Sequence, residues 1–159
     1  MTTTPTLELR NLEVAYTVRG IDRQVLRGVS LSIAPGEAYG LVGESGCGKS
    51  TAAFAAMRYL PRNGKITNGS ILFEGKDIVD INDDEVAKLR RSAISMVYQN
   101  PATALNPTIR IGKQIAEVFE LNGVSSSDAM MMAEQALTRV QIADPARVLR
   151  RYAHQLSGG

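Results

Sequence analysis

The stretch Gly43-Glu44-Ser45-Gly46-Cys47-Gly48-Lys49-Ser50 carries the pattern on which the expected fold depends. Glycine has no side chain and adopts unusual dihedral angles, so Gly43, Gly46 and Gly48 let successive backbone N–H groups curl around an anion. A lysine and a serine follow at the spacing typical of loops that hold nucleotide phosphates. An ordinary glycine-rich turn does not require these residue types at these positions. The stretch therefore predicts a phosphate-binding loop.

The residues of this loop have distinct expected roles. Lys49 is placed to reach the β- and γ-phosphates, the Ser50 hydroxyl to coordinate Mg²⁺, and Thr51 to donate to the α-phosphate. Glu44, Ser45 and Cys47 are expected to line the nucleotide through their backbone groups. Cys47 needs no reactive role, because its position in such a loop tolerates many residues.

The flanking segments predict a strand before the loop and a helix after it. Residues 37–42 form a mostly apolar run after the Pro35-Gly36 turn, which is typical of a buried strand. Residues 49–60 are rich in alanine and place Phe54, Met57 and Leu60 on one helical face. A strand, a glycine-rich loop and a helix in this order are the context in which a phosphate-binding loop operates.

Composition predicts a soluble, cytoplasmic, globular chain. The sequence has 159 residues, of which 44% are hydrophobic, enough for one domain with a sizeable core. Its longest apolar stretch, residues 52–57, is far shorter than the roughly 20 residues that span a bilayer. The first residues have neither a basic segment nor an apolar core, so a signal peptide is not indicated. The single cysteine excludes an intramolecular disulfide and a cysteine-based zinc site.

The charge pattern does not favour nucleic-acid binding. The net charge is only +2, and the basic pairs Arg90-Arg91 and Arg150-Arg151 are not interleaved with aromatic residues. We interpret both pairs as solvated helix faces.

Strand patterns dominate before residue 99 and helix patterns after it, which predicts a mixed α/β part joined to a helical part. The Asn82 and Glu85 spacing resembles a capping box, and a phase slip near Arg10-Asn11 suggests a β-bulge. Three methionines, 130–132, are expected in the helical core, with a sticky partner surface as the alternative. Strands are expected at 7–16, 25–33, 70–73 and 93–98, and helices at 83–91, 111–121, 125–140 and 145–152.

Across essentially the whole chain, this arrangement resembles the ATPase subunit of ABC transporters. Tyr16 lies where that family has an aromatic residue that stacks on adenine, and residues 43–50 match its Walker A loop. Gln99 occupies the Q-loop position, and Leu156-Ser157-Gly158-Gly159 begins the signature motif. Residues 98–107, with the sequence Tyr-Gln-Asn-Pro-Ala-Thr-Ala-Leu-Asn-Pro, are similar to the importers of dipeptides, oligopeptides and nickel.

The resemblance implies an α/β fold. Its core would be that of a P-loop NTPase (RecA-like), and an antiparallel β subdomain and a helical subdomain would be attached to this core. Residues 1–100 would form the partial core and residues 101–159 the helical subdomain. Gln99 would approach Mg²⁺ and the attacking water, while Ser157, Gly158 and Gly159 would face the γ-phosphate held by a partner subunit. Each role has a plainer alternative: a packing residue for Tyr16, a loop amide for Gln99, and a flexible tail for the last three residues.

The resemblance also implies cofactors, partners and a location. ATP and Mg²⁺ would be the cofactors, and a second ATPase subunit would bind head to tail. Transmembrane permease subunits would hold the pair at the inner face of the cell membrane, and a solute-binding protein would act indirectly. No nucleic acid is expected among the partners.

Hydrolysis of this type needs an apolar strand that ends in Asp followed by Glu, and the chain has no such pair. Asp84-Glu85 lies in a polar helix start instead. We therefore expect an N-terminal portion, truncated before the Walker B strand, that binds ATP without hydrolysing it and has exposed apolar edges. The alternative is a naturally truncated nucleotide-binding module without turnover.

Overall fold

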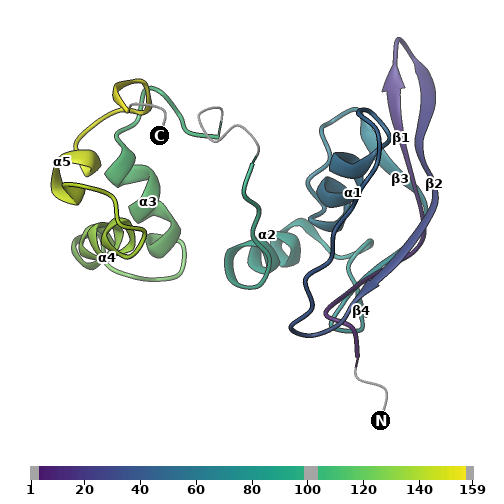
Figure 1. The fold of residues 1–159 in the computed structure, drawn as a ribbon, viewed down its shortest axis with the longest axis horizontal. Helices are drawn as coiled ribbons and strands as arrows, with labels where there is room; N and C mark the ends of the chain where they lie inside the picture. The colour runs from purple at the N-terminus through teal and green to yellow at the C-terminus, as the bar shows by residue number, and fades with distance from the viewer. Residues whose placement is uncertain (1–3, 99–103, 157–159) are drawn as a thin grey trace. The chain divides into compact units, whose positions relative to one another are not determined.

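The computed structural model describes residues 4–98 and 104–156, and the chain forms two compact units, Met1–Ile94 and Ser95–Gly159 (Figure 1). The first unit contains β1 (Leu7–Val18), β2 (Ile21–Ile33), α1 (Lys49–Ala56), β3 (Gly64–Phe73), β4 (Lys76–Asp77) and α2 (Asp83–Ser92). The second contains α3 (Ile111–Glu120), α4 (Ser126–Arg139), α5 (Pro145–Leu149) and the short 3₁₀ helix η2 (Ala153–Gln155).

The strands of the first unit form one antiparallel sheet in the order β2-β1-β3-β4. Arg19 and Gly20, with φ of 52° and 77°, join β1 to β2 in a two-residue hairpin whose left-handed turn matches the twist of the strands. We expected a connection that ran to residue 23 and a β2 that began at Val25. That prediction was wrong, because this turn lets pairing start already at Val18 and Ile21.

The predicted β-bulge in the first strand is confirmed. The pairing of β1 with β2 shifts between Leu9 and Leu12, and Asn11 at the shift has a φ of 45°. The backbone N–H of Asn11 donates to Ser30 Oγ at 2.8 Å, so the extra residue keeps a hydrogen-bond partner. Gly69 of β3 lies opposite, where a Cβ would stand 2.4 Å from the Asn11 carbonyl oxygen.

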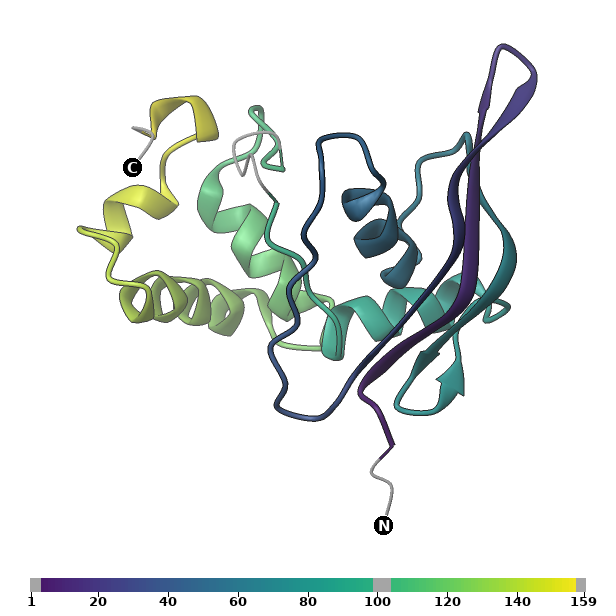
Figure 2. The same ribbon diagram turned by 45° about the vertical axis from the view of Figure 1, so that its right-hand side comes forward.

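Helix α1 packs on one face of this sheet and forms the core with it (Figure 2). Its buried residues are all alanines, Ala52, Ala55 and Ala56, which let the helix approach the strands closely. The sheet supplies the larger apolar side chains. These are Leu9, Leu12, Val14, Leu26 and Ile71, and Ile78 after β4 joins them. Burying a Leu, Ile or Val side chain stabilises a fold by about 1.5–3 kcal/mol, so this cluster is the main source of stability in the unit.

Helix α1 ends earlier than the expected residue 60, because the chain turns left-handed at Arg58. The N–H of Tyr59 donates to the Phe54 carbonyl and the N–H of Arg58 to the Ala55 carbonyl, both at 2.8 Å. This pair of bonds defines a Schellman motif, which usually has glycine at the left-handed position. Here that residue is Arg58, with a φ of 54°, a conformation that costs a side-chain-bearing residue about 1 kcal/mol.

Helix α2 begins at the predicted cap. Asn82 Oδ1 accepts a hydrogen bond from the Glu85 N–H at 2.9 Å, which satisfies one of the open donors in the first turn. The second half of the expected capping box is different. The Glu85 carboxylate accepts from Lys76 Nζ at 3.0 Å, and this ion pair, helped by its Coulomb attraction, lowers the pKa of Glu85.

The second unit is a small helical bundle around Ala116, Ala129, Ala133 and Leu149. Ser125 caps α4, and Gly123, with a φ of 86°, ends the turn after α3 near the predicted position. The expectation that Met130, Met131 and Met132 pack in the core was wrong. All three are exposed, because the alanines at 129 and 133 occupy the helix face that meets α3.

Two apolar runs that we predicted as strands, 37–42 and 93–98, do not form strands. Val42 is 98% exposed and Val97 is 96% exposed. An apolar run becomes a strand only where a neighbouring strand pairs with it, accepting from its N–H groups and donating to its C=O groups. The described sheet consists of β1 to β4 and includes neither run. Both segments therefore expose apolar side chains. The exposed edges of a parallel sheet that we expected stay a prediction, because neither segment belongs to the described sheet.

Gly69 lies so close to the backbone of Asn11 that adding a methyl group at Gly69 should strongly reduce stability. Gly69→Ala should lower the free energy of unfolding by about 2–4 kcal/mol, because it adds a steric clash to an unfavourable positive φ. Gly20→Ala is the matched control, since Gly20 also has a positive φ but has open space around it. That control should cost about 1 kcal/mol. Urea unfolding measures both, and equal losses would contradict the proposed clash.

Candidate functional site

The predicted phosphate-binding loop leads directly into α1, and Gly48 is the N-cap of that helix. Gly48 has a φ of 99° and a ψ of 3°, a left-handed conformation that favours glycine. A Cβ at this position would lie 2.8 Å from Leu26 Cδ2 of β2. The helix start is thus held against the sheet at a point where only glycine fits.

The start of α1 presents backbone donors that have no partner in the part of the chain that the structure describes. The first bond that closes the helix runs from the Ala52 N–H to the Gly48 carbonyl at 2.9 Å. The N–H groups of Lys49, Ser50 and Thr51 precede it and have no partner within the helical ladder. These donors and the positive end of the helix dipole favour an anion at this position.

The side chain of Lys49 turns back into the loop. Its Nζ donates to the carbonyl oxygens of Gly43, at 2.8 Å, and Glu44, at 2.7 Å, and lies 3.5 Å from Cys47 Sγ. The loop therefore curls around an ammonium group, which adds a full positive charge next to the helix N-terminus. An anionic oxygen is a stronger partner for this ammonium than a neutral carbonyl.

The other loop residues are open to solvent. Glu44, Ser45, Gly46, Cys47 and Ser50 are exposed. Cys47 has a free thiol. An exposed Ser50 hydroxyl on the first turn of α1 fits a metal position in which phosphate and water oxygens supply the other ligands. The described residues contain no cluster of three or more His, Cys, Asp or Glu side chains suited to a metal ion.

Tyr16 lies on β1 opposite Arg23 of β2 and Gly64 of β3. Its ring covers Gly64, where a Cβ would stand 2.8 Å from Tyr16 Cε1, and it packs at the edge of the core. The side chain is only half-buried, so part of the ring is accessible. The loop is close to this region of the sheet. Gly48 contacts Leu26 of β2, and Leu26 is only three residues from Arg23, the β2 partner of Tyr16.

Four predicted site residues lie outside the described parts of the chain. They are Gln99, Ser157, Gly158 and Gly159. The described part of the site therefore consists of the loop, the start of α1 and Tyr16, all of which belong to the first unit.

Sequence reasoning missed the residue that fixes the far end of α1. Arg90 of α2 donates from Nε to the Met57 carbonyl at 2.9 Å and from Nη2 to the Arg58 carbonyl. Its guanidinium lies 5.2 Å from the centre of the Tyr59 ring. We had interpreted Arg90 as part of a solvated face, and for Arg90 that was wrong. No local pattern signals this contact, because its partners lie more than 30 residues earlier in the chain.

Comparison with known proteins identifies the class. A family profile described as ABC transporter matches residues 26–159, and the chain belongs to this family. It is 41% identical over 155 residues to the dipeptide transport ATP-binding protein DppD of Bacillus subtilis. The aligned region covers 96% of this chain and 46% of that protein.

Other relatives have related names. The oligopeptide transport ATP-binding protein OppD of Bacillus subtilis is 39% identical over 96% of this chain and 43% of its own length. OppD of Escherichia coli K12 is 37% identical, with coverage of 96% and 45%. The chain thus spans about half the length of the curated relatives it matches.

Solved structures confirm the α/β fold class predicted from the sequence. The dimeric bacterial ABC transporter cassette MJ0796 matches with a TM-score of 0.78 and 25% identity, over 96% of this chain and 63% of that chain. A post-hydrolysis state of the same cassette, bound to ADP and Pi, matches with the same TM-score, 24% identity and coverage of 95% and 63%. Among the residues that the structure describes, no helix has the length and apolar character to cross a membrane.

The Arg90 contacts predict a measurable contribution to stability. Arg90→Met should lower the free energy of unfolding by about 1–3 kcal/mol, because two helix-end carbonyls lose their charged donor. Arg91→Met is the matched control, since Arg91 is exposed and lies on the same helix. That control should change stability by less than about 0.5 kcal/mol. Equal losses in chemical denaturation would show that the guanidinium contacts contribute nothing.

Proposed function

We propose that the loop of residues 43–51 binds the phosphate chain of ATP together with Mg²⁺. The observation that carries this proposal is the Lys49 ammonium, held inside a loop at a helix start with unpaired N–H groups. Lys49 exchanges its carbonyl partners for the β- and γ-phosphate oxygens, and the N–H groups of the loop bind the remaining oxygens. The Ser50 hydroxyl holds Mg²⁺, which offsets phosphate charge, and Thr51 donates to the α-phosphate.

The accessible part of the Tyr16 ring stacks on the base. An aromatic ring binds any purine through its face, so this contact adds affinity without strong selection of adenine. The position of Tyr16 next to β2, against which the loop is packed, supports this role.

The whole protein, in this proposal, is an ATPase that powers import of peptides or a related small solute. Its relatives are named as ATP-binding proteins of dipeptide and oligopeptide transport. The permease and a solute-binding protein would select the solute, and the permease would hold this subunit at the inner face of the membrane. Gln99 would position Mg²⁺ and water and respond to the permease.

A second ATPase subunit completes the site. The related cassette MJ0796 is described as a dimer, which supports a pair of such subunits here. Ser157, Gly158 and Gly159 would contact the γ-phosphate of the nucleotide on the partner, using a hydroxyl and backbone N–H groups. Each subunit would then contribute to both nucleotide sites in a head-to-tail arrangement.

The lysine at the centre of the loop gives the direct test. Lys49→Ala should abolish Mg-ATP binding in isothermal titration calorimetry, because the main positive charge at the β- and γ-phosphates is lost. Lys88→Ala, an exposed lysine on α2, is the matched control and should bind as the unchanged chain does. Unchanged affinity in Lys49→Ala would contradict the assignment of the loop.

The 159-residue chain by itself should bind ATP without turnover. Its sequence has no apolar run that ends in Asp followed by Glu, the pattern that would place a carboxylate to activate water. Phosphate release by the purified chain should stay at background. A rate of about 1 s⁻¹ or more that disappears in Lys49→Ala would show that the chain has another catalytic base.

A further inference from the structure

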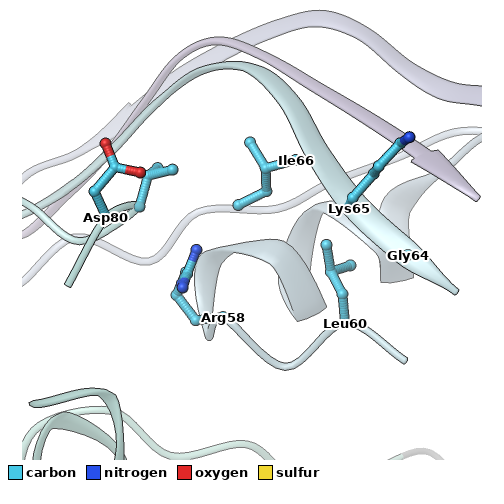
Figure 3. Close-up of a pocket in the computed structure, with 7 residues that line it drawn as sticks. Arg58, Leu60, Gly64, Lys65, Ile66 and Asp80 are labelled. Carbon is cyan, nitrogen blue, oxygen red and sulfur yellow. The ribbon is translucent and has the colours of Figure 1, made fainter. Parts of the chain in front are cut away.

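The first unit has a cavity of about 350 Å³ at the end of α1 opposite to the phosphate-binding loop (Figure 3). Its walls come from the turn after α1, from β3 and from the segment after β4. Three lining side chains are charged, Arg58, Lys65 and Asp80, and three are apolar, Leu60, Ile66 and Val79. A volume of this size lies at the lower end of the range for small-molecule sites.

Arg58 is the unusual residue of this wall. It occupies the left-handed position of the Schellman motif, where glycine is the residue without strain. Its Nε–H is buried and has no acceptor among the described residues. A buried donor without an acceptor is costly, and so is the backbone conformation, so the arginine side chain is not explained by the stability of the helix end.

The three charges of the cavity are not equivalent. Lys65 Nζ is already paired with Asp22 Oδ2 at 2.5 Å, and its side chain extends away from Arg58 in Figure 3. Asp80 is exposed and forms no ion pair or hydrogen bond with the residues that the structure describes. Counting partners within residues 4–98 and 104–156 alone, the cavity thus has one unpaired guanidinium, one unpaired carboxylate and an apolar wall between β3 and the end of α1.

The geometry points to a second ligand site, one that binds a free amino acid with an apolar side chain. The α-carboxylate of the ligand pairs with the Arg58 guanidinium, whose planar donors match a carboxylate. Its ammonium pairs with Asp80, and its side chain packs on Leu60, Ile66 and Val79. A phosphate or nucleotide is disfavoured because Asp80 repels it, and a neutral apolar molecule would leave both charges unpaired.

This site is separate from the phosphate-binding loop and does not depend on nucleotide binding. The two sites lie at opposite ends of α1, an eight-residue helix of about 12 Å. Amino-acid binding should therefore persist in Lys49→Ala. If the chain does not bind nucleotide, the inference of an amino-acid site is unaffected. If it does not bind an amino acid, the proposed nucleotide site is unaffected.

Titration calorimetry of the full chain with L-leucine tests the inference. A ligand of about nine non-hydrogen atoms that uses both charges should bind with a dissociation constant on the order of 0.1–1 mM. N-acetyl-L-leucine lacks the ammonium and L-leucinamide lacks the carboxylate, and each should bind at least roughly tenfold more weakly. Absence of leucine binding, or equal binding of either analogue, would overturn the assignment.

Arg58→Gly separates a loss of the site from a loss of folding. Glycine adopts the left-handed conformation without strain, so this variant should unfold at the same or a higher urea concentration than the unchanged chain. Its affinity for leucine should nevertheless fall at least roughly tenfold. The affinity of Asp80→Asn for leucine should fall by a similar factor. Arg62→Gln, an exposed arginine outside the cavity wall, is the matched control. Leucine binding that survives in Arg58→Gly would contradict the proposed contact.

Discussion

The structure of the first unit depends on how α1 is fixed to the antiparallel sheet. Three alanines on one face of the helix allow close contact with Leu9, Leu12 and Ile71 of the sheet. At the helix start, Gly48 contacts Leu26 where no side chain would fit, and beyond the helix end Arg90 binds the carbonyls of Met57 and Arg58. Because both ends are fixed, the open N–H groups at the start of α1 keep one position relative to the Lys49 ammonium. That constraint makes the loop suited to an anion without the help of other charged side chains.

Short-range signals in the sequence predicted the elements that form through short-range contacts. The cap at Asn82 and the loop before α1 are each determined by residues within a few positions of one another. The bulge at Asn11 forms in the pairing with β2, but the phase slip that predicts it is visible in β1 alone. The runs 37–42 and 93–98 have the composition of strands, yet strand formation depends on partners elsewhere in the chain, and the described sheet includes neither. The contacts of Arg90 and the exposure of Met130 were missed for the same reason. Both depend on which distant segments meet, and a single sequence does not encode that in any local spacing.

The two ends of α1 differ in chemistry although they belong to one short helix. The loop end has backbone donors and Lys49 and suits a multivalent anion. Among the described residues, the Arg58 end has one unpaired cation, one unpaired carboxylate and apolar side chains, and suits a small zwitterion. In the first case the motif is visible in the sequence because its residues are contiguous. In the second the lining residues are spread over residues 58–80, and the only local sign is an arginine in place of the glycine that usually ends a helix in this way.

The affinity of the chain for ATP, ADP and AMP, measured side by side by calorimetry with Mg²⁺ present, is the most direct test of phosphate recognition by residues 43–51. Each phosphate adds charge-assisted hydrogen bonds to Lys49 and to the loop N–H groups, whereas the base and sugar are the same in all three ligands. ATP and ADP should therefore bind at least roughly 100-fold more tightly than AMP. Equal affinity for the three nucleotides would show that the loop does not bind the phosphate chain and would contradict the central claim.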